Sequence, residues 1–283
     1  MKRRLFLGFL ALAFALSSSA QVFHGPAFHP APGGGPSLVG TPVVRYYVDE
    51  AASGTGPTAV VDRSGNSYDL TTINYGAGNM AYAEPAAGMR ALDSISVNGT
   101  QRAMRAIDNT SDAVRDALAG VTQATIELVL RLDAGNSNGG RVFGINDRAG
   151  SDGELIVKAP NDVNTALNLS FNDVSSPESA NIGTARVVVH IVLDSTQGTA
   201  TNRIRVYING ALDLTGIGDN VGLNETLALA ADLDLIAFNR DSGGSFDRSF
   251  DGALFYAAIY AEAFTQQMVT DNFDILTLDD DQP

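Results

Sequence analysis

The feature that most constrains the fold is the strict alternation of side chains in Thr125–Leu132, TIELVLRL. Every second residue from Ile126 onward is aliphatic, while the intervening positions include Glu127 and Arg131. A period of two residues is typical of a β-strand with one buried face, whereas a helix face repeats every ~3.6 residues. This stretch therefore predicts a long strand with its aliphatic face turned toward a core.

Short apolar runs of the same kind occur along most of the chain, separated by clusters of Gly, Asn, Asp and Ser. They are VVRYYVD, RVFGI, ELIVK, ALNLSF, ARVVVHIVLD, RIRVYI, LDLIAF and ALFYAAIY. Many short strands with turn signals between them favour a β-sandwich or barrel. Helix-length periodicity is almost absent, which argues against a βαβ fold.

The run Asn202–Leu214, NRIRVYINGALDL, indicates a hairpin. Ile204, Val206 and Ile208 alternate with Arg203, Arg205 and Tyr207 up to the dipeptide Asn209-Gly210. Asn-Gly suits a type I′ turn, because both central residues of that turn have positive φ. The chain is therefore expected to reverse here and to return antiparallel.

Two short helices interrupt the strand pattern. The first is SDAVRDALAG, in which Ser111 is a suitable N-cap and Gly120 a suitable C′ residue. The second is FTQQMVTDNFDIL, in which Thr265 is a suitable N-cap and Phe264 and Val269 are spaced as a hydrophobic staple.

The N-terminus has the pattern of a signal peptide over residues 1–20: basic Lys2–Arg4, an apolar segment, and small Ser18 and Ala20. We expect cleavage after Ala20, with a retained membrane anchor as the alternative. No other run is apolar enough to span a membrane. A Pro/Gly-rich linker over 21–42, one domain over 43–277 and a solvated acidic tail over 278–283 are expected to follow.

The formal net charge of −14 argues against nucleic-acid binding, which requires a basic surface. The chain has no cysteine, so no disulfide can form and stability has to come from a buried core. One histidine within the domain and no cysteine also argue against a zinc enzyme. These properties fit a secreted, periplasmic or cell-surface protein of bacterial type.

Several of these segments, taken in order, resemble the laminin-G-like jelly-roll domains of the concanavalin A-like lectin and glucanase superfamily. The similarity covers Val43–Leu276 and includes VVVHIVLDS, NRIRVYING and SFDGALFYAAIYAEAF, together with the front loop DRSGN. The matching residues are Asp62, Ser64, Gly65, Asn66, His190, Tyr207, Asn209, Gly210, Phe250, Gly252, Ile259 and Tyr260.

The resemblance implies an all-β fold, a two-sheet antiparallel jelly-roll sandwich, here with two short helices. It also implies binding of sugars, proteins or calcium more often than catalysis. It does not fix a ligand, because one fold serves many functions.

Catalysis finds little support in the residues. Retaining glycosidases place two carboxylates about 5 Å apart, and the glucanases of this superfamily carry them as E-x-D-x-x-E on one strand. Here Glu127 is followed on its face by Val129 and Arg131, which cannot supply the second carboxylate. Glu127 and Arg131 are expected to pair with each other or with neighbouring strands, and His190 is expected to be structural.

Calcium is the one cofactor that the sequence suggests, since it prefers carboxylate, amide and carbonyl oxygens. The candidate ligands are Asp62, Asn66, Asp247 and Asp251. Many relatives carry an acidic residue shortly after the closing glycine, where this chain has Leu254–Tyr256, and that difference weakens the case. The alternative is that these residues cap turns.

The rim of a ligand site is expected at two polar, Gly-rich loops, DAGNSNGGR and NDRAGSDGE. The candidate ligand-binding residues are Asn136, Asn138, Asp147 and Asp152 in these loops, with Glu127, Arg131 and His190 on the strands. The chain has no Trp, which argues against a site built on ring stacking.

The sequence therefore predicts an exported, non-catalytic binding module whose ligand is a glycan or a surface protein. A divergent polysaccharide hydrolase or lyase and a structural or adhesion protein of the envelope are the alternatives. The oligomeric state is left open.

Overall fold

The computed structural model describes residues 37–55, 57–73, 80–94, 103–106, 108–133, 140–146, 154–159, 166–172, 174–175, 178–179, 181–213, 220–229, 233–239 and 248–281. The signal peptide expected at 1–20 and most of the linker lie outside these residues. Within them, no helix is both long and apolar enough to cross a membrane.

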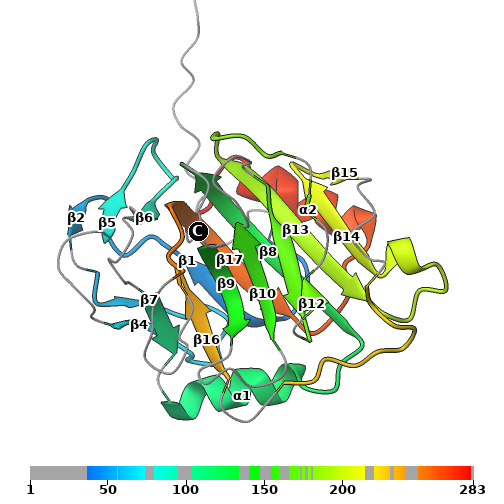
Figure 1. Ribbon diagram of the computed structural model, residues 1–283. Helices are drawn as coiled ribbons and strands as arrows, with labels where there is room; N and C mark the ends of the chain where they lie inside the picture. The colour runs from blue at the N-terminus through cyan, green and yellow to red at the C-terminus, as the bar shows by residue number, and fades with distance from the viewer. Residues whose placement is uncertain are drawn as a thin grey trace, which may run out of the picture. The chain divides into compact units, whose positions relative to one another are not determined.

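The described strands form two antiparallel sheets, here named sheet A and sheet B (Figure 1). Sheet A has nine strands in the order β15-β14-β13-β8-β17-β6-β5-β2, with β1 also paired to β17. Its strands are β1 Pro42–Tyr47, β2 Gly54–Thr55, β5 Met80–Ala83, β6 Ala91–Ser94, β8 Gln123–Leu132, β13 Val187–Asp194, β14 Ile204–Ile208, β15 Ala211–Asp213 and β17 Gly252–Tyr260.

Sheet B has eight strands in the order β12-β11-β10-β9-β16-β7-β4-β3. They are β3 Ala59–Val60, β4 Leu70–Ile73, β7 Ala103–Ala106, β9 Gly140–Asn146, β10 Leu155–Ala159, β11 Asn168–Phe171, β12 Val174–Ser175 and β16 Asp234–Ala237. The prediction of an all-β fold with two antiparallel sheets is thus confirmed.

The core lies between the sheets and consists of the aliphatic faces that the alternation predicts. Leu128 and Leu130 of β8 and Ile191 of β13 belong to one buried cluster with Phe143 of β9. Tyr46 of β1 packs edge-on against Phe143 with ring centroids 6.0 Å apart, so the contact joins the two sheets. Burial of these apolar side chains is the main favourable term in folding, as a chain without disulfides requires.

Among the described residues, two α-helices accompany the sheets. Helix α2, Gln266–Leu276, begins as expected at Thr265, whose hydroxyl accepts from Met268 N at 3.3 Å. It covers the outer face of sheet A, where Phe264 and Val269 are buried in a second apolar cluster (Figure 1). Helix α1, Asp108–Leu118, begins three residues before the expected N-cap Ser111 and packs Val114 and Leu118 into the main core. A 3-10 turn covers Ala200–Asn202.

The hairpin at Asn209-Gly210 is confirmed. Asn209 and Gly210 have φ of 51° and 77°, the left-handed values of a type I′ turn. Asn209 Oδ1 also accepts from Val188 N at 3.0 Å, which fixes the turn to the neighbouring strand β13. The register places Tyr207 directly opposite His190, so both side chains project to the outer face of sheet A.

The acidic C-terminus differs from the solvated tail that the sequence predicts. Asp280 is fully buried and accepts a hydrogen bond from Arg186 Nε at 2.9 Å, while Asp281 Oδ1 accepts from Arg90 N at 2.9 Å. A run of aspartates usually remains in water, but here two arginines distant in sequence hold it. At the other end, Val39 N donates to Asn272 Oδ1 at 2.7 Å, so the packed structure begins before Val43.

Candidate functional site

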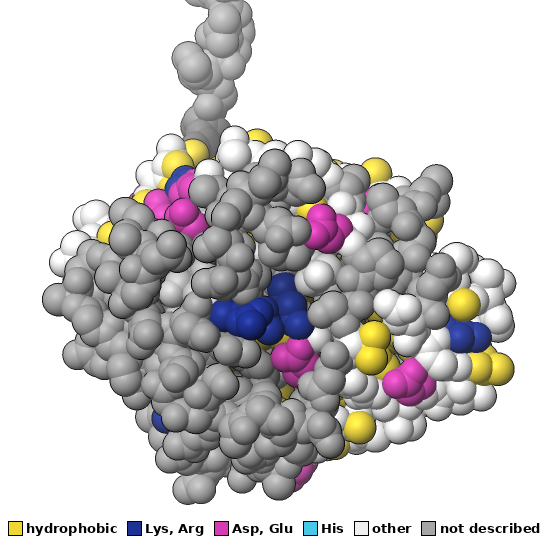
Figure 2. All heavy atoms as spheres, in the orientation of Figure 1, with side chains coloured by type: hydrophobic (Ala, Val, Ile, Leu, Met, Phe, Trp, Pro, Cys, Tyr) yellow, Lys and Arg dark blue, Asp and Glu magenta, His cyan; other side chains and the backbone are white. Residues whose placement is uncertain are grey.

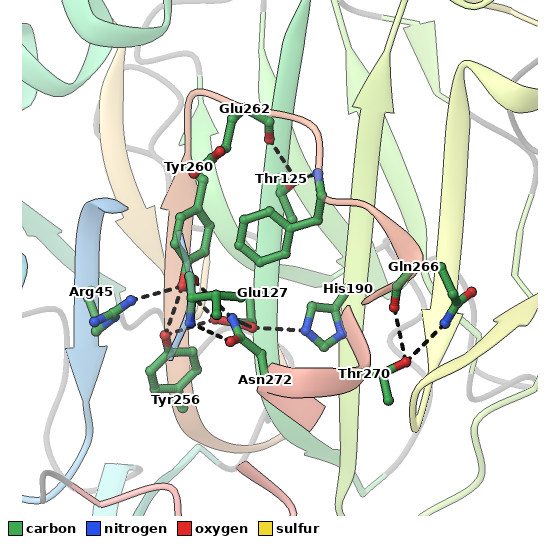
Figure 3. A network of polar contacts seen from close by, with 12 residues as sticks. Arg45, Thr125, Glu127, His190, Tyr256, Tyr260, Glu262, Gln266, Thr270 and Asn272 are labelled. Carbon is green, nitrogen blue, oxygen red and sulfur yellow. Dashed lines mark hydrogen bonds and ion pairs between the residues drawn. The ribbon is translucent and has the colours of Figure 1, made fainter. Parts of the chain in front are cut away.

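Glu127 and His190, both expected at the site, lie directly opposite each other on β8 and β13 (Figure 3). Glu127 Oε1 accepts from His190 Nε2 and from Asn272 Nδ2, each at 2.8 Å. Its other oxygen accepts from Tyr256 at 2.9 Å and from Tyr260 at 2.7 Å. Two donors on each oxygen satisfy this buried carboxylate completely.

The environment keeps Glu127 ionised. Burial by itself would raise the pKa of this carboxyl, but the hydrogen bond and charge of His190, with Tyr260 and Asn272, hold the pKa below its usual range. An ionised carboxylate only accepts, so His190 Nε2 carries the hydrogen of their contact. His190 Nδ1 is buried and has no hydrogen-bond partner among the residues that the structure covers.

This network is covered by α2. Glu127 and His190 are both 0% exposed, and Asn272 of α2 contacts the carboxylate from above the sheet. The side chains that bond Glu127 are an imidazole, an amide and two phenols, so no second carboxylate contacts it within the described structure. The arrangement ties α2 to sheet A.

Arg131 lies on the same strand face as Glu127, beyond buried Val129. Its guanidinium contacts Asp93 of β6 at 2.9 Å and Asp133 at 2.7 Å. The hydrogen bond to Asp133 is the main cause of a raised pKa. Arg131 thus pairs with a neighbouring strand, as the sequence suggests, and it does not converge on Glu127.

Asp62 and Asn66, two of the candidate calcium ligands, lie in one turn. Asp62 Oδ1 accepts from Arg45 N at 3.0 Å and Ser64 N at 2.9 Å. Its Oδ2 accepts from Ser64 Oγ at 2.7 Å and Tyr68 N at 3.0 Å. Asn66 Nδ2 donates to a backbone carbonyl at 2.9 Å. Asp62 thus caps the turn with both of its oxygens, whereas Asn66 ties the turn to Val43 of β1.

The remaining predicted site residues are mostly outside the described residues. Asp251 is the exception, and its backbone carbonyl accepts from Asp133 N at 3.2 Å. Across the part of the chain that the structure describes, no group of three or more His, Cys, Asp or Glu side chains is arranged to hold a metal ion. The residues outside it are Asn136, Asn138, Asp147, Asp152 and Asp247.

A second group of polar side chains, which sequence reasoning missed, lies on the outer face of sheet B. In β10, Leu155 and Val157 belong to the core, so Ile156 and Lys158 project to the opposite face. Figure 2 views the side opposite α2, where Lys and Arg side chains gather beside acidic ones near the middle. The charged residues that the strands and their flanks bring there are Arg105, Arg141, Glu154, Lys158, Asp234 and Arg248.

These charges are arranged around a small apolar patch. Lys158 Nζ contacts Glu154 at 2.7 Å, and Arg105 contacts Asp234 at 3.2 Å. Buried Ala103, Ile156 and Ile236 form a separate cluster on the same face. All three residues are 0% exposed, so this apolar cluster is closed to solvent.

Three cations of this face, Arg141, Lys158 and Arg248, are named here the basic cluster. Arg141 and Lys158 are directly opposite in the β9–β10 register, and Arg141 N donates to Arg248 O at 3.0 Å. Arg141 is 6% exposed and Lys158 8%. Burial lowers the pKa of Lys158, Glu154 opposes that shift, and Arg141 and Arg248 add to it. Like charges directly opposite in a sheet are destabilising.

The sequence contains part of the signal for this face. ELIVK alternates so that Glu154, Ile156 and Lys158 share one side, which strand periodicity alone could show. The sheet order alone shows that β9 lies between β10 and β16. This order brings Arg141 and Asp234 to the same face.

Comparison with known proteins identifies similar folds but no family to which the chain can be assigned. Neither a scan against models of protein families nor a search of curated proteins found a match. Among solved structures, sialidase from Trypanosoma rangeli with the inhibitor DANA is similar at TM-score 0.55 and 12% identity, covering 85% of this chain and 34% of that protein. The chain thus spans about a third of the sialidase's length.

Two further structures are similar. Domain 4 of AbnA, an extracellular GH43 arabinanase from Geobacillus stearothermophilus in complex with arabinotriose, has TM-score 0.53 and 17% identity, with 82% of this chain and 97% of that domain covered. The binding domain of botulinum neurotoxin DC with rat synaptotagmin II has TM-score 0.51 and 11% identity, with 83% and 52% covered. At these identities the likeness establishes a β-sandwich of jelly-roll type.

Proposed function

We propose that this chain is an exported, non-catalytic binding module of the laminin-G-like type, and that it binds a glycan on the outer face of sheet B. The observation that carries the proposal is the contrast between the two outer faces. Helix α2 and the Glu127 network occupy the outer face of sheet A, whereas the charged side chains of sheet B project on the side away from α2.

Two further points support a glycan. The arabinanase domain is matched over nearly its whole length and holds a trisaccharide, although at an identity that carries only the fold. Asn168 of β11 lies opposite Lys158, and its Oδ1 has no hydrogen-bond partner within the described structure. An amide beside charged groups is suited to hydrogen-bonding sugar hydroxyls.

The hydrolase alternative has one observation in its favour. Glu154 and Asp234 lie on the same outer face, Glu154 just before β10 and Asp234 on β16, the two strands that flank β9. A glycosidase acid needs a raised pKa, however, and the charge and hydrogen bond of Lys158 overcome burial and lower the pKa of Glu154. The lowered pKa therefore argues against Glu154 as the acid of such a reaction.

The test is a glycan array probed with the whole chain, followed by titration of any hit. We expect at least one glycan to bind without being cleaved, as judged by the reducing ends released. Asn168→Ala should weaken binding, and Gln267→Ala on exposed α2 should not. Release of reducing ends by the pure protein would support the hydrolase, and capture of proteins without any glycan would support the adhesion protein.

Calcium remains part of this proposal. A cation that binds only the native protein raises its melting temperature. Unfolding should therefore be compared in millimolar calcium and in chelator, and identical melting temperatures would remove calcium from the proposal.

A further inference from the structure

We propose that Lys158 and Asn168 join in an isopeptide bond that forms within the folded protein, with Glu154 as the base. Lys158 of β10 lies directly opposite Asn168 of β11, and Lys158 Nζ contacts Glu154 Oε1 at 2.7 Å. This covalent modification goes beyond the proposed function. The carbonyl oxygen of Asn168 remains in the product, so glycan binding and the cross-link do not depend on each other.

Lys158 is unusual in the sequence. Apart from Lys2, in the expected signal peptide, it is the one lysine of the chain, and the other basic side chains besides histidine are arginines. Arginine stays protonated in proteins, whereas a buried lysine can lose its proton and then acts as a nucleophile. The basic cluster therefore contains one side chain that can form a new bond, and that side chain lies opposite an amide.

Strand pairing brings the amine to the amide. Residues directly opposite each other in an antiparallel pair project on the same face, with Cβ atoms about 4.5–5.5 Å apart. The long, flexible side chain of Lys158 can span that gap to the Cγ of Asn168. Asn168 Oδ1 has no hydrogen-bond partner in the part of the chain that the structure describes, so no such bond holds this oxygen elsewhere.

The surroundings favour a neutral amine in contact with a base. Lys158 and Asn168 are each 8% exposed and Glu154 is 7% exposed, so water has little access to the three side chains. Ile156 and Ile236 on the same face are closed to solvent, and burial is the main cause of a lowered pKa at Lys158. The 2.7 Å contact between Nζ and Glu154 is short enough for proton transfer.

The reaction balances without an oxidant or a cofactor. Glu154 takes one proton from the ammonium group of Lys158, and the neutral Nζ attacks Cγ of Asn168. A second proton passes from Nζ to Nδ2 as the bond between Cγ and Nδ2 breaks. Ammonia leaves, takes the proton held by Glu154 and departs as ammonium, so the carboxylate is restored and an amide joins the two strands.

The test is the mass of one tryptic fragment of the whole chain. Trypsin cuts after Arg148, Arg186 and unmodified Lys158, so a free lysine gives two peptides between the two arginines. We expect instead one peptide over 149–186 that is lighter than its sequence by the mass of one ammonia. Tandem mass spectrometry should give no fragment ions from breaks within 158–168, because the cross-link holds that loop together.

Three variants test the chemistry. Lys158→Arg should abolish the loss of ammonia, because arginine cannot form the bond, whereas cyclisation of Asn168 on its own backbone would persist in this variant. Glu154→Gln should lower the cross-linked fraction at least about tenfold, since it removes the base. Glu262→Gln is the matched control, because this glutamate follows β17 of sheet A, and it should leave the cross-link unchanged. Circular dichroism checks that the variants fold.

Three results would count against the inference. Complete cleavage after Lys158 in the native protein, without the lighter peptide, would overturn it and leave the proposed function standing. A loss of ammonia that persists in Lys158→Arg would assign the loss to Asn168 alone. Equal cross-linked fractions in Glu154→Gln and Glu262→Gln would overturn the role of Glu154 as the base.

Discussion

The side-chain amide of Asn272 donates to Glu127 Oε1 at 2.8 Å, across 145 residues of sequence. Asn272 Oδ1 also accepts from Val39 N at 2.7 Å, and Asn272 Nδ2 donates to Val39 O at 3.2 Å. One residue of α2 therefore joins the middle of sheet A to the segment that precedes β1. The predictions below begin with this network.

Replacing Glu127 with Leu removes the acceptor of four hydrogen bonds and leaves four buried donors without it. We expect a loss of about 3–5 kcal/mol in the free energy of unfolding, the range measured when one partner of a buried charged pair is removed. Urea unfolding measures it. Asp116→Asn, at an exposed site on α1, should change stability by less than about 0.5 kcal/mol, and equal effects would contradict this account.

Asp280 gives the protein an unusual pH dependence. Burial raises its pKa to about 7, since the contact with Arg186 does not fully offset the loss of hydration. A carboxyl with a raised folded-state pKa favours folding while protonated, so its contribution is present at low pH and is lost as pH rises through about 7. Urea midpoints at pH 5 and 8 should therefore differ less in Asp280→Asn than in the native protein. An unchanged difference would argue against this role for Asp280.

Glu127 has the opposite effect on how folding stability depends on pH. Its pKa is lowered in the folded protein, so its contribution is present above the ordinary pKa of a glutamate and is lost as pH falls through the folded value. Acid unfolding should move to higher pH in Glu127→Gln, as followed by circular dichroism. If the variant unfolded in acid at the same pH as the native protein, Glu127 would not control acid unfolding.

Gly210 should resist substitution. Its φ of +77° suits glycine, and an added Cβ would lie 3.0 Å from the ring of Phe273 in α2. Gly210→Ala should cost about 1–2 kcal/mol in thermal or urea unfolding. Gly198→Ala is the matched control, because Gly198 has no positive φ and open space around it. Equal costs at the two sites would show that neither the backbone strain nor the contact with Phe273 matters.

Replacing Asp62 distinguishes a role in capping the turn from a role in binding calcium. Its two oxygens already accept four hydrogen bonds, so Asp62→Ala should lower the melting temperature through loss of the cap alone. The decrease should be the same in calcium and in chelator. A decrease seen only in calcium would show that Asp62 is a metal ligand.

Local features of the fold could be predicted from the sequence because short-range rules govern them. Side-chain alternation places Glu127 opposite the aliphatic core face, Asn209-Gly210 forms its turn, and Thr265 caps α2. The start of α1 was wrong because Asp108, Asn109, Thr110 and Ser111 are all residue types that cap helices, and sequence alone does not choose among them.

The candidate site could not be predicted to the same extent, because it depends on pairings between distant segments. Alternation shows that Glu127 points away from the core, but only the packing of α2 shows that it is covered. Likewise, ELIVK gives Lys158 a direction, while the register with β9 gives it Arg141 as a neighbour. Asp280 was taken for a solvated residue because its partner Arg186 lies 94 residues away.

The position of β17 has a consequence for how the polypeptide reaches its final form. This strand, made of some of the last residues of the chain, pairs with β1, near the start of the described residues, and with β8 and β6. Sheet A is therefore incomplete until the segment through Tyr260 has been synthesised, and contacts between such distant residues form slowly.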